Sequence, residues 1–210
     1  PVVAAMVGLV GSGKSSVAKE LAKKIGGTII ETDAIRIQLR KAGECYEGAR
    51  KIGETAIEEV IRRGCNAVID SDNISEEKRA ASLVIAKKLK AKLVFVRTYA
   101  DYDVMAGWTI SAKYQNKPED FFGGASSSWK GNEQIKGAAV KLREMWRRTP
   151  QHYRWENKGG GKWILKKLPF KVFAEIDTSN PKKWKREVAN IFDLYRIGKY
   201  GNKRGQTRRD

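Results

Sequence analysis

The chain has 210 residues and a formal net charge of +18, with 42 Lys and Arg against 24 Asp and Glu. This length suits one α/β domain with a buried core. The apolar runs are too short to span a bilayer, and Cys45 and Cys65 fit neither a disulfide framework nor a metal site. These features argue against a membrane protein and a secreted disulfide-rich domain, and we expect a cytoplasmic protein.

The positive charge is unevenly distributed along the chain. Residues 1–100 hold 18 Lys and Arg against 12 Asp and Glu (net +6), and residues 101–210 hold 24 against 12 (net +12). A surplus of this kind favours a polyanionic partner, with nucleic acid as the first candidate. The alternative is that the positive charge reflects a generally basic or thermophilic proteome and no polyanionic partner.

A glycine-rich segment near the start of the chain has the pattern of a phosphate-binding loop (P-loop). Residues 8–15 read Gly-Leu-Val-Gly-Ser-Gly-Lys-Ser, after an apolar run at 2–7 and before an amphipathic helical pattern that ends near Gly26. In this context Lys14 is expected to contact β- and γ-phosphates and Ser15 to bind Mg²⁺. The predicted nucleotide-binding residues are Gly11, Ser12, Gly13, Lys14, Ser15 and Ser16.

Strand and helix patterns alternate along the rest of the chain. Further strands are predicted at 28–31, 66–70, 93–96 and 171–177, and further helices at 47–63, at 75–90 and after residue 181. Such alternation produces a parallel sheet covered on both faces. The predicted fold is an α/β three-layer sandwich with a mainly parallel five-stranded sheet.

The stretch between the fourth and last strands, residues 98–162, is too long for a passive loop. We predict an inserted lid with a helix at about 132–148 and a linker at 158–162, within a single domain 1–197 that precedes a basic, flexible tail at 198–210. His152, the only histidine, lies among aromatic residues and an arginine. This composition suits stacking on single-stranded bases, but a packed loop is the favoured interpretation.

An acidic and a basic residue directly follow the second predicted strand. Asp33 and Arg36 lie one helical turn apart, at the edge of the sheet where open α/β folds bind ligands. Asp33 would orient an acceptor hydroxyl and accept its proton in a phosphoryl transfer, and Arg36 would hold an acceptor phosphate. The alternative is that Asp33 caps a helix and Arg36 is a solvated helix residue.

These motifs, together with residues 68–73 (Val-Ile-Asp-Ser-Asp-Asn), resemble the P-loop kinases grouped with phage-type polynucleotide 5′-hydroxyl kinases and zeta toxins. The resemblance covers residues 1–97 well and 172–195 loosely. It implies a P-loop kinase-like fold and ATP with Mg²⁺ as the phosphoryl donor. Asp33 would be the general base, and Arg36 would contact the phosphate next to the acceptor hydroxyl. Asp70 would support the metal, with Asp72 as the second candidate, and Asn73 would lie near the acceptor.

In the same family a lid supplies arginines that stabilise charge on the transferred phosphoryl group. The best match here is Arg143 with Arg147, four residues apart on one helix face. Arg148 points elsewhere and is kept as an alternative, because helix ends vary by one or two residues. The alternative is a basic, solvated helix face. The stretch from Asp101 to Trp129 departs from the family, because it is longer and more aromatic than a simple lid.

The favoured function is an ATP- and Mg²⁺-dependent kinase that phosphorylates the 5′-hydroxyl of RNA or DNA. Asp33, Lys14 and the lid arginines would act in catalysis. One alternative is a small-molecule kinase of the zeta-toxin kind, with a nucleotide sugar, a sugar or an antibiotic as acceptor. The other is a nucleotide-dependent, RNA-binding ATPase. The oligomeric state stays open.

Overall fold

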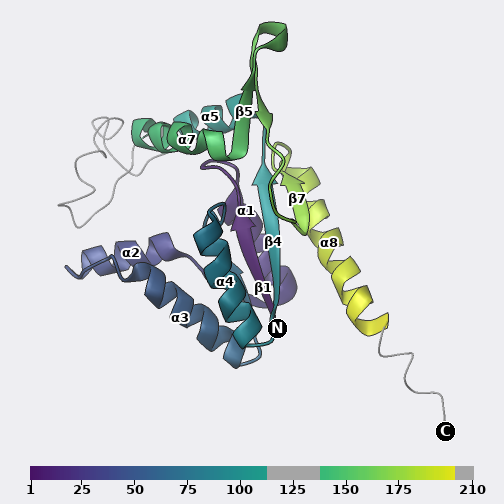
Figure 1. The fold of residues 1–210 in the computed structure, drawn as a ribbon. Helices are drawn as coiled ribbons and strands as arrows, with labels where there is room; N and C mark the ends of the chain where they lie inside the picture. The colour runs from purple at the N-terminus through teal and green to yellow at the C-terminus, as the bar shows by residue number, and fades with distance from the viewer. Residues whose placement is uncertain (113–137, 202–210) are drawn as a thin grey trace.

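The computed structural model describes residues 1–112 and 138–201 (Figure 1). A five-stranded sheet forms its centre, and its strands pair in parallel in the order β2-β3-β1-β4-β7. The strands are β1 (Val2–Val7), β2 (Gly27–Ile30), β3 (Asn66–Ile69), β4 (Lys92–Tyr99) and β7 (Ala174–Asp177). The predicted α/β fold with a parallel five-stranded sheet is confirmed.

The central strand β1 is buried on both faces because helices cover both sides of the sheet. The helices of the core are α1 (Lys14–Ile25), α2 (Thr32–Lys41), α3 (Ala49–Arg62), α4 (Glu76–Lys88) and α8 (Pro181–Gly201). Met6 packs on the side of α1 and α8, whereas Val3 and Ala5 pack on the side of α3 and α4. A strand buried on both faces needs a continuous apolar sequence, as residues 2–7 have.

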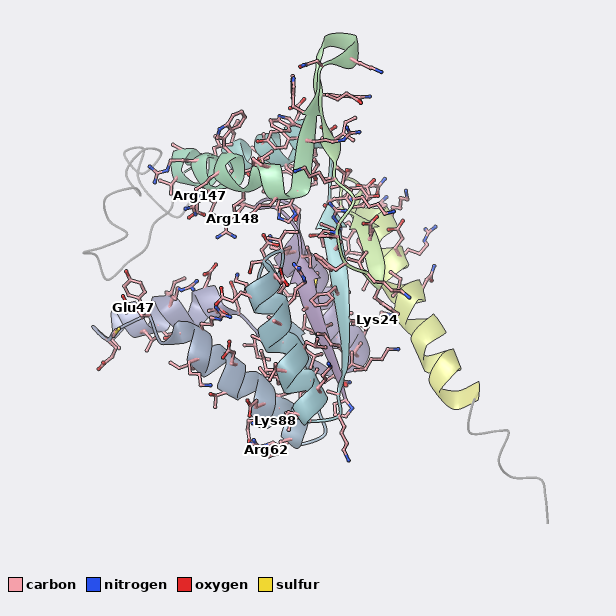
Figure 2. All side chains as sticks on the ribbon, viewed as in Figure 1. Lys24, Glu47, Arg62, Lys88, Arg147 and Arg148 are labelled. Atoms are coloured by element: carbon pink, nitrogen blue, oxygen red, sulfur yellow. The ribbon has the colours of Figure 1, made fainter. Side chains whose placement is uncertain are left out.

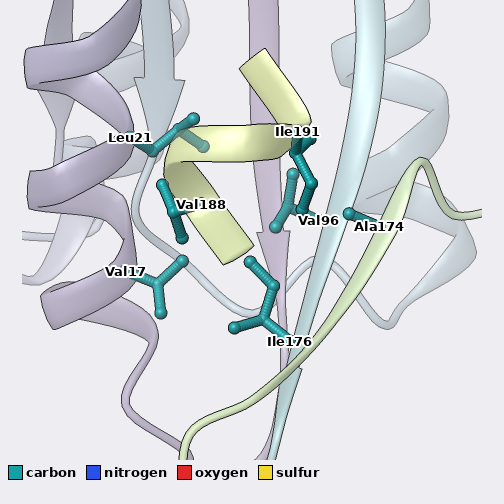
Figure 3. Close-up of a pocket in the computed structure, with 7 residues that line it drawn as sticks. All are labelled: Val17, Leu21, Val96, Ala174, Ile176, Val188 and Ile191. Carbon is teal, nitrogen blue, oxygen red and sulfur yellow. The ribbon is translucent and has the colours of Figure 1, made fainter. Parts of the chain in front are cut away.

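The last helix is attached to the sheet by apolar contacts (Figure 3). Val188 and Ile191 of α8 lie beside Val17 and Leu21 of α1 and Ile176 of β7, in one apolar cluster. This cluster links the C-terminal part of the domain to the helix that follows the P-loop.

Two helix ends have the local structure that their sequence predicts. Gly26 ends α1 in a left-handed conformation (φ 61°), and its N–H donates to the carbonyl of Ala22. Ser75 begins α4, where its side chain accepts a hydrogen bond from the N–H of Lys78. Such caps satisfy backbone groups that a helix leaves unpaired at its ends.

The inserted region forms a separate layer beyond the carboxyl ends of the strands (Figure 1). Its described elements are α5 (Tyr102–Ser111), α7 (Ala138–His152), β5 (Tyr153–Glu156) and β6 (Lys162–Leu165). We call these elements the lid. Met105, Met145 and Tyr153 form a small apolar core within it, and Leu9 of the P-loop enters the same core. The lid is therefore packed directly on the P-loop.

The segment 158–162, predicted as a linker, is the turn of an antiparallel hairpin between β5 and β6. Gly159, Gly160 and Gly161 have φ values of 66°, 92° and 81°. Glycine adopts this region without steric cost, so three in succession allow the chain to reverse. A glycine-rich run suits a linker and a hairpin turn equally well, and only the pairing of the flanking strands distinguishes them.

Two predicted boundaries also differ. Helix α7 continues past residue 148 to His152, because Thr149 and His152 are buried and add tertiary contacts to the last turn; residues 132–137 of the predicted helix lie outside the described residues. Helix α8 includes residues 198–201, which were expected in the tail, and 202–210 lie outside the described residues. Within the described part of the chain, no helix is long and apolar enough to cross a membrane.

Candidate active site

The P-loop joins β1 to α1 through two glycines in left-handed conformations. Gly11 has φ 85°, and Gly13, the residue before α1, has φ 76°. Left-handed glycines beside a helix N-terminus allow successive backbone N–H groups to surround an anion. Ser15 and Ser16 are exposed on the first turn of α1. The predicted phosphate site therefore has the required backbone conformation.

Side chains from the ends of β4 and β7 hold this loop in place. The hydroxyl oxygens of Ser12 and Thr98 lie 2.8 Å apart, and the Thr178 hydroxyl donates to the Ser12 carbonyl at 3.1 Å. A Cβ atom at Gly8 would lie 2.5 Å from both Ser12 Oγ and Thr98 Oγ1. Only glycine fits there, so packing fixes the start of the loop before any nucleotide binds.

Lys14 contacts the loop's own carbonyl groups. Its Nζ donates to Gly8 O at 2.8 Å and to Leu9 O at 2.9 Å. Burial lowers the pKa of Lys14, and the negative charges of Asp72 and Asp70 partly offset that effect. A triphosphate entering the loop would exchange these carbonyl contacts for phosphate oxygens.

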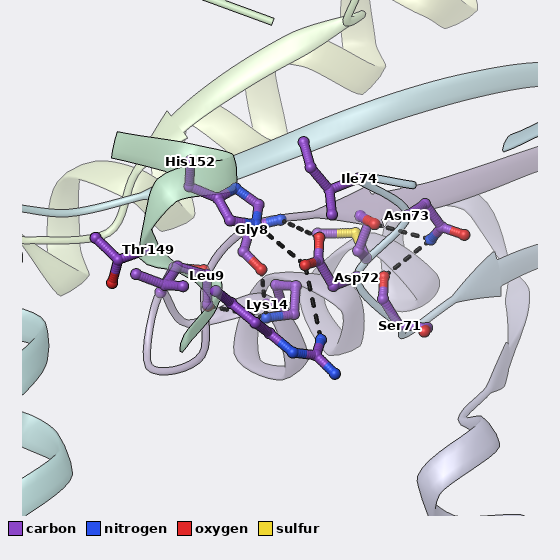
Figure 4. Close-up of polar contacts among 12 residues, drawn as sticks. Gly8, Leu9, Lys14, Ser71, Asp72, Asn73, Ile74, Thr149 and His152 are labelled. Atoms are coloured by element: carbon purple, nitrogen blue, oxygen red, sulfur yellow. Dashed lines mark hydrogen bonds and ion pairs between the residues drawn. The ribbon is translucent and has the colours of Figure 1, made fainter. Parts of the chain in front are cut away.

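Asp72 connects the P-loop to the lid (Figure 4). Its Oδ1 accepts from the N–H of Gly8 at 3.2 Å, and its Oδ2 lies 3.0 Å from His152 Nε2 and 3.9 Å from Arg148 Nη1. Burial acts to raise the pKa of Asp72, but the hydrogen bond and charge of His152, the charge of Lys14 and the Gly8 N–H outweigh burial, so the pKa is lowered. The Asp72 carboxylate is thus held as an anion.

The two candidate carboxylates for the metal differ in their contacts. Both are buried at the end of β3, but Asp72 is bound to Gly8 and His152. Within the described residues, the structure records no hydrogen bond or ion pair to the Asp70 carboxylate. The Ser15 hydroxyl and the Asp70 carboxylate are hard oxygen ligands of the kind that Mg²⁺ prefers, so these residues fit a magnesium ion bound with a nucleotide.

The predicted base and the predicted acceptor-binding arginine contact each other on the first turns of α2. Asp33 Oδ1 lies 2.6 Å from Arg36 Nη1, and the two side chains are 76% and 42% exposed. The charge of Asp33 is among those that raise the pKa of Lys14, so its carboxylate lies within electrostatic range of the P-loop. Its role as a base stays a prediction.

A cleft lies between α2, α3 and α4, beyond the end of β3. It is open to solvent, and Ile57, Ile69 and Ile85 form its apolar part. Its polar lining consists of Thr32, Arg36, Arg50, Glu54, Ser71, Asn73, Lys78 and Ser82. The two predicted acceptor-binding residues, Arg36 and Asn73, therefore border one cleft.

Asn73 also has a structural role that the sequence did not predict. Its Nδ2 donates to Met6 O at 2.8 Å and to Ser71 O at 2.9 Å, and its backbone N–H also donates to Met6 O. The side chain is 2% exposed. Both amide donors are thus used to hold the segment after β3 against β1, which leaves only the amide oxygen for an acceptor.

The lid arginine closest to the P-loop is Arg148, and not one of the predicted pair. Arg143 and Arg147 are exposed, whereas Arg148 is partly buried below α7 at 3.9 Å from Asp72 (Figure 2). The sequence pattern separated the faces of this helix correctly, and the role of Arg143 and Arg147 stays a prediction. Helical spacing alone does not show which face packs on the P-loop.

Sequence reasoning also missed His152 as a contact of the site. Its imidazole is 1% exposed and binds Asp72, so it is a packed residue and does not stack on nucleic acid bases. Its carbonyl accepts from the backbone N–H of Lys166 at 2.8 Å and from Arg97 Nη2 at 3.4 Å. One sequence feature could have indicated this contact. Arg148 and His152 are four residues apart, which places them on the same face of a helix.

A family model described as an AAA domain matches residues 3–122. The chain belongs to this family. The matched part includes the P-loop, Asp33 and the carboxylates that follow β3. A comparison with curated proteins finds no match.

Solved kinases share the fold. A candidate kinase from Chloroflexus aurantiacus has a TM-score of 0.62 at 12% identity, over 92% of this chain and 97% of that one. A gluconokinase from Sinorhizobium meliloti has 0.53 at 17%, over 96% and 97%, and the APS kinase of Mycobacterium tuberculosis has 0.50 at 14%, over 91% and 96%. These likenesses show a P-loop kinase fold. The kinases with a stated substrate act on small molecules, and the polynucleotide kinase branch of the predicted resemblance is not supported by them.

We predict that His152→Ala lowers the free energy of unfolding by about 1–3 kcal/mol, because it leaves the buried Asp72 carboxylate without one partner. Urea denaturation followed by circular dichroism measures the change. The matched control is Arg147→Ala, on the exposed side of the same helix, with an expected change within about 0.5 kcal/mol. Equal effects of the two substitutions would contradict a stabilising contact at Asp72.

Proposed function

We propose that the protein is an ATP- and Mg²⁺-dependent kinase that phosphorylates a hydroxyl group of a small, anionic acceptor bound in the cleft between α2, α3 and α4. The observation that carries this proposal is the connection of the cleft to the P-loop. Lys78, in the cleft wall, donates to Asp72 O at 3.0 Å, and Asp72 accepts from Gly8 at the start of the loop. Donor and acceptor sites are thus neighbours.

The lining and charge of the cleft support a small anionic acceptor. Three isoleucines form its apolar wall and polar side chains border them, a combination typical of small-molecule sites. Arg50 is paired with Glu54 and Glu77. Lys78 Nζ instead donates to Ser71 Oγ and a backbone carbonyl, and burial lowers its pKa despite the opposing charge of Asp72. A phosphate or carboxylate of the acceptor would be a negatively charged partner for the ammonium group of Lys78.

The reaction that fits these residues is an in-line phosphoryl transfer. The acceptor oxygen bonds to the γ-phosphorus while the bond from that phosphorus to the bridging oxygen breaks, so ADP leaves. The acceptor proton passes to the Asp33 carboxylate. Lys14 and Arg148 stabilise negative charge on the transferred group, and Arg36 orients the acceptor. Mg²⁺, held by Ser15 with support from Asp70, would neutralise phosphate charge.

A polynucleotide with a free 5′-hydroxyl is the second candidate acceptor. The net charge of +18 and its concentration in the second half of the chain favour it. The lining of the cleft and the small-molecule kinases among the similar structures favour the first candidate.

Labelling with γ-labelled ATP and Mg²⁺ tests the proposal on a panel of sugars, sugar phosphates, nucleotide sugars and 5′-hydroxyl oligonucleotides. We expect label on a small acceptor that carries a phosphate or carboxylate. Label on oligonucleotides alone, with a KM that rises steeply with salt, would select the second candidate. Label released only as inorganic phosphate would contradict the kinase function.

We predict that Asp33→Asn lowers kcat by about 10²- to 10⁴-fold, because an amide cannot accept the acceptor proton. The KM for ATP should change little, since Asp33 lies outside the P-loop. Steady-state kinetics with the labelled acceptor measure both constants. Glu76→Gln, an exposed carboxylate at the start of α4, is the control. ATP turnover that survives Asp33→Asn undiminished would indicate an ATPase without a hydroxyl acceptor.

Among the lid arginines, Arg148→Gln should lower kcat more than Arg143→Gln or Arg147→Gln. Loss of one group that stabilises transition-state charge typically costs about 10²- to 10³-fold in kcat. The other two arginines are exposed and serve as controls of equal charge on the same helix. A larger loss at Arg143 or Arg147 would restore the sequence-based assignment.

A further inference from the structure

Three tryptophans form a surface on the lid, away from the P-loop. Trp163 of β6 contacts Trp155 of β5 and Trp146 of α7, with ring centroids 5.3 Å and 5.8 Å apart. Trp146 is 64% exposed and Trp155 is 50% exposed. We call these three residues the aromatic ridge. The hairpin that carries part of it projects away from the central sheet (Figure 1).

The aromatic ridge continues the apolar core of the lid out to solvent. Tyr102 packs on Trp163 with ring centroids 5.2 Å apart, and Tyr153, further inside, is 3% exposed. A soluble domain gains stability by burying tryptophan, so neighbouring tryptophans left half-exposed indicate a surface that meets a partner.

Trp155 is held in one position before any partner binds. Its Nε1 donates to Asn157 Oδ1 at 2.6 Å. A Cβ atom at Gly161 would lie 2.2 Å from Cζ2 of Trp155, so the indole rests on the backbone of the hairpin turn. A ring that is already immobilised and still half-exposed loses little entropy when a flat ligand stacks on it.

The surroundings of the aromatic ridge are strongly basic. Residues 138–167 contain nine Lys and Arg against two Glu. Lys158 is exposed in the hairpin turn, and Arg143 and Arg147 are exposed on α7. Arg154 and Lys162 alternate with Trp155 and Trp163 along the strands and lie on the other face of the hairpin. The surface therefore combines flat aromatic rings with cations, which complement the bases and the phosphates of a nucleic acid strand.

We propose that the aromatic ridge binds single-stranded nucleic acid, with bases stacked on Trp155 and Trp146 and with phosphates on the surrounding Lys and Arg side chains. Bases of a duplex are paired and stacked on one another, so only a single strand offers them to exposed rings. The surface contains no residue of the P-loop or the cleft. The proposal therefore does not depend on the acceptor of the kinase reaction.

Binding of fluorescein-labelled oligothymidylate and oligouridylate of about 12 nucleotides tests the proposal, a length within the site sizes of single-strand binding domains. Fluorescence anisotropy is measured with the full chain and without ATP. We expect Trp155→Ala to weaken binding about tenfold or more, since stacking contributes about 1–3 kcal/mol per base. Trp155→Phe should retain most of the affinity. Phe173→Ala, which removes a half-exposed ring outside the lid, should leave it unchanged.

Two further variants separate stacking from charge. Gly161→Ala should displace the Trp155 ring and weaken binding while every charge is kept. Replacing Arg143 and Lys158 by Gln should reduce the slope of log affinity against log salt by about 1.4, at about 0.7 per phosphate contact on a single strand. The matched control replaces Lys87 and Lys90 by Gln, at the far end of α4, and should leave the slope unchanged.

Absence of binding to both oligonucleotides overturns the proposal, and so does binding that Trp155→Ala and Gly161→Ala leave unchanged. Sedimentation velocity of the protein alone tests whether a second copy of this chain, and not nucleic acid, occupies the aromatic ridge. If Trp155→Ala abolishes self-association and does not affect oligonucleotide binding, the aromatic ridge is a contact between copies of this chain and the proposal is wrong. The binding measurements contain no ATP. Their result is therefore independent of whether the labelling experiment with γ-labelled ATP detects kinase activity.

Discussion

The buried carboxylate of Asp72 joins the three parts of the molecule that the site needs. An unpaired buried charge is strongly destabilising, so its oxygens require partners, and these come from Gly8 in the P-loop and His152 at the end of α7. The carbonyl of His152 in turn accepts from Arg97 on β4. The conformation of the P-loop and the position of the lid therefore depend on each other.

This connection explains the electrostatics of the phosphate site. It brings Arg148 within 3.9 Å of Asp72, and the positive charge of Arg148 is one of those that lower the pKa of Lys14. Asp70 and Asp72 oppose that effect, so the phosphate site combines cations with carboxylates. Among the described residues, Asp70 lacks the contacts that occupy Asp72, which is why Asp70 is the carboxylate proposed to support a metal ion.

The proposed acceptor cleft and much of the positive charge lie on different surfaces of the molecule. In the cleft between α2, α3 and α4, most of the charged side chains are paired or hydrogen-bonded within the protein. The basic surplus of the second half lies in large part on the lid, around the aromatic ridge. Net charge is a property of the whole surface and does not identify which part of it binds a substrate.

Local sequence patterns determined the P-loop, the five strands, the ends of α1 and α4, and the placement of Asp33 and Arg36 after β2, because each depends on residues close together in the chain. Other features depended on tertiary structure. The Asp72–His152 contact joins residues 80 positions apart. The choice of Arg148 over Arg143 and Arg147 depends on which face of α7 packs on the core. The hairpin exists because its strands pair, and its glycines alone are equally compatible with a linker. Local conformation follows from neighbouring residues, whereas contacts between distant segments follow only from how complete elements pack together.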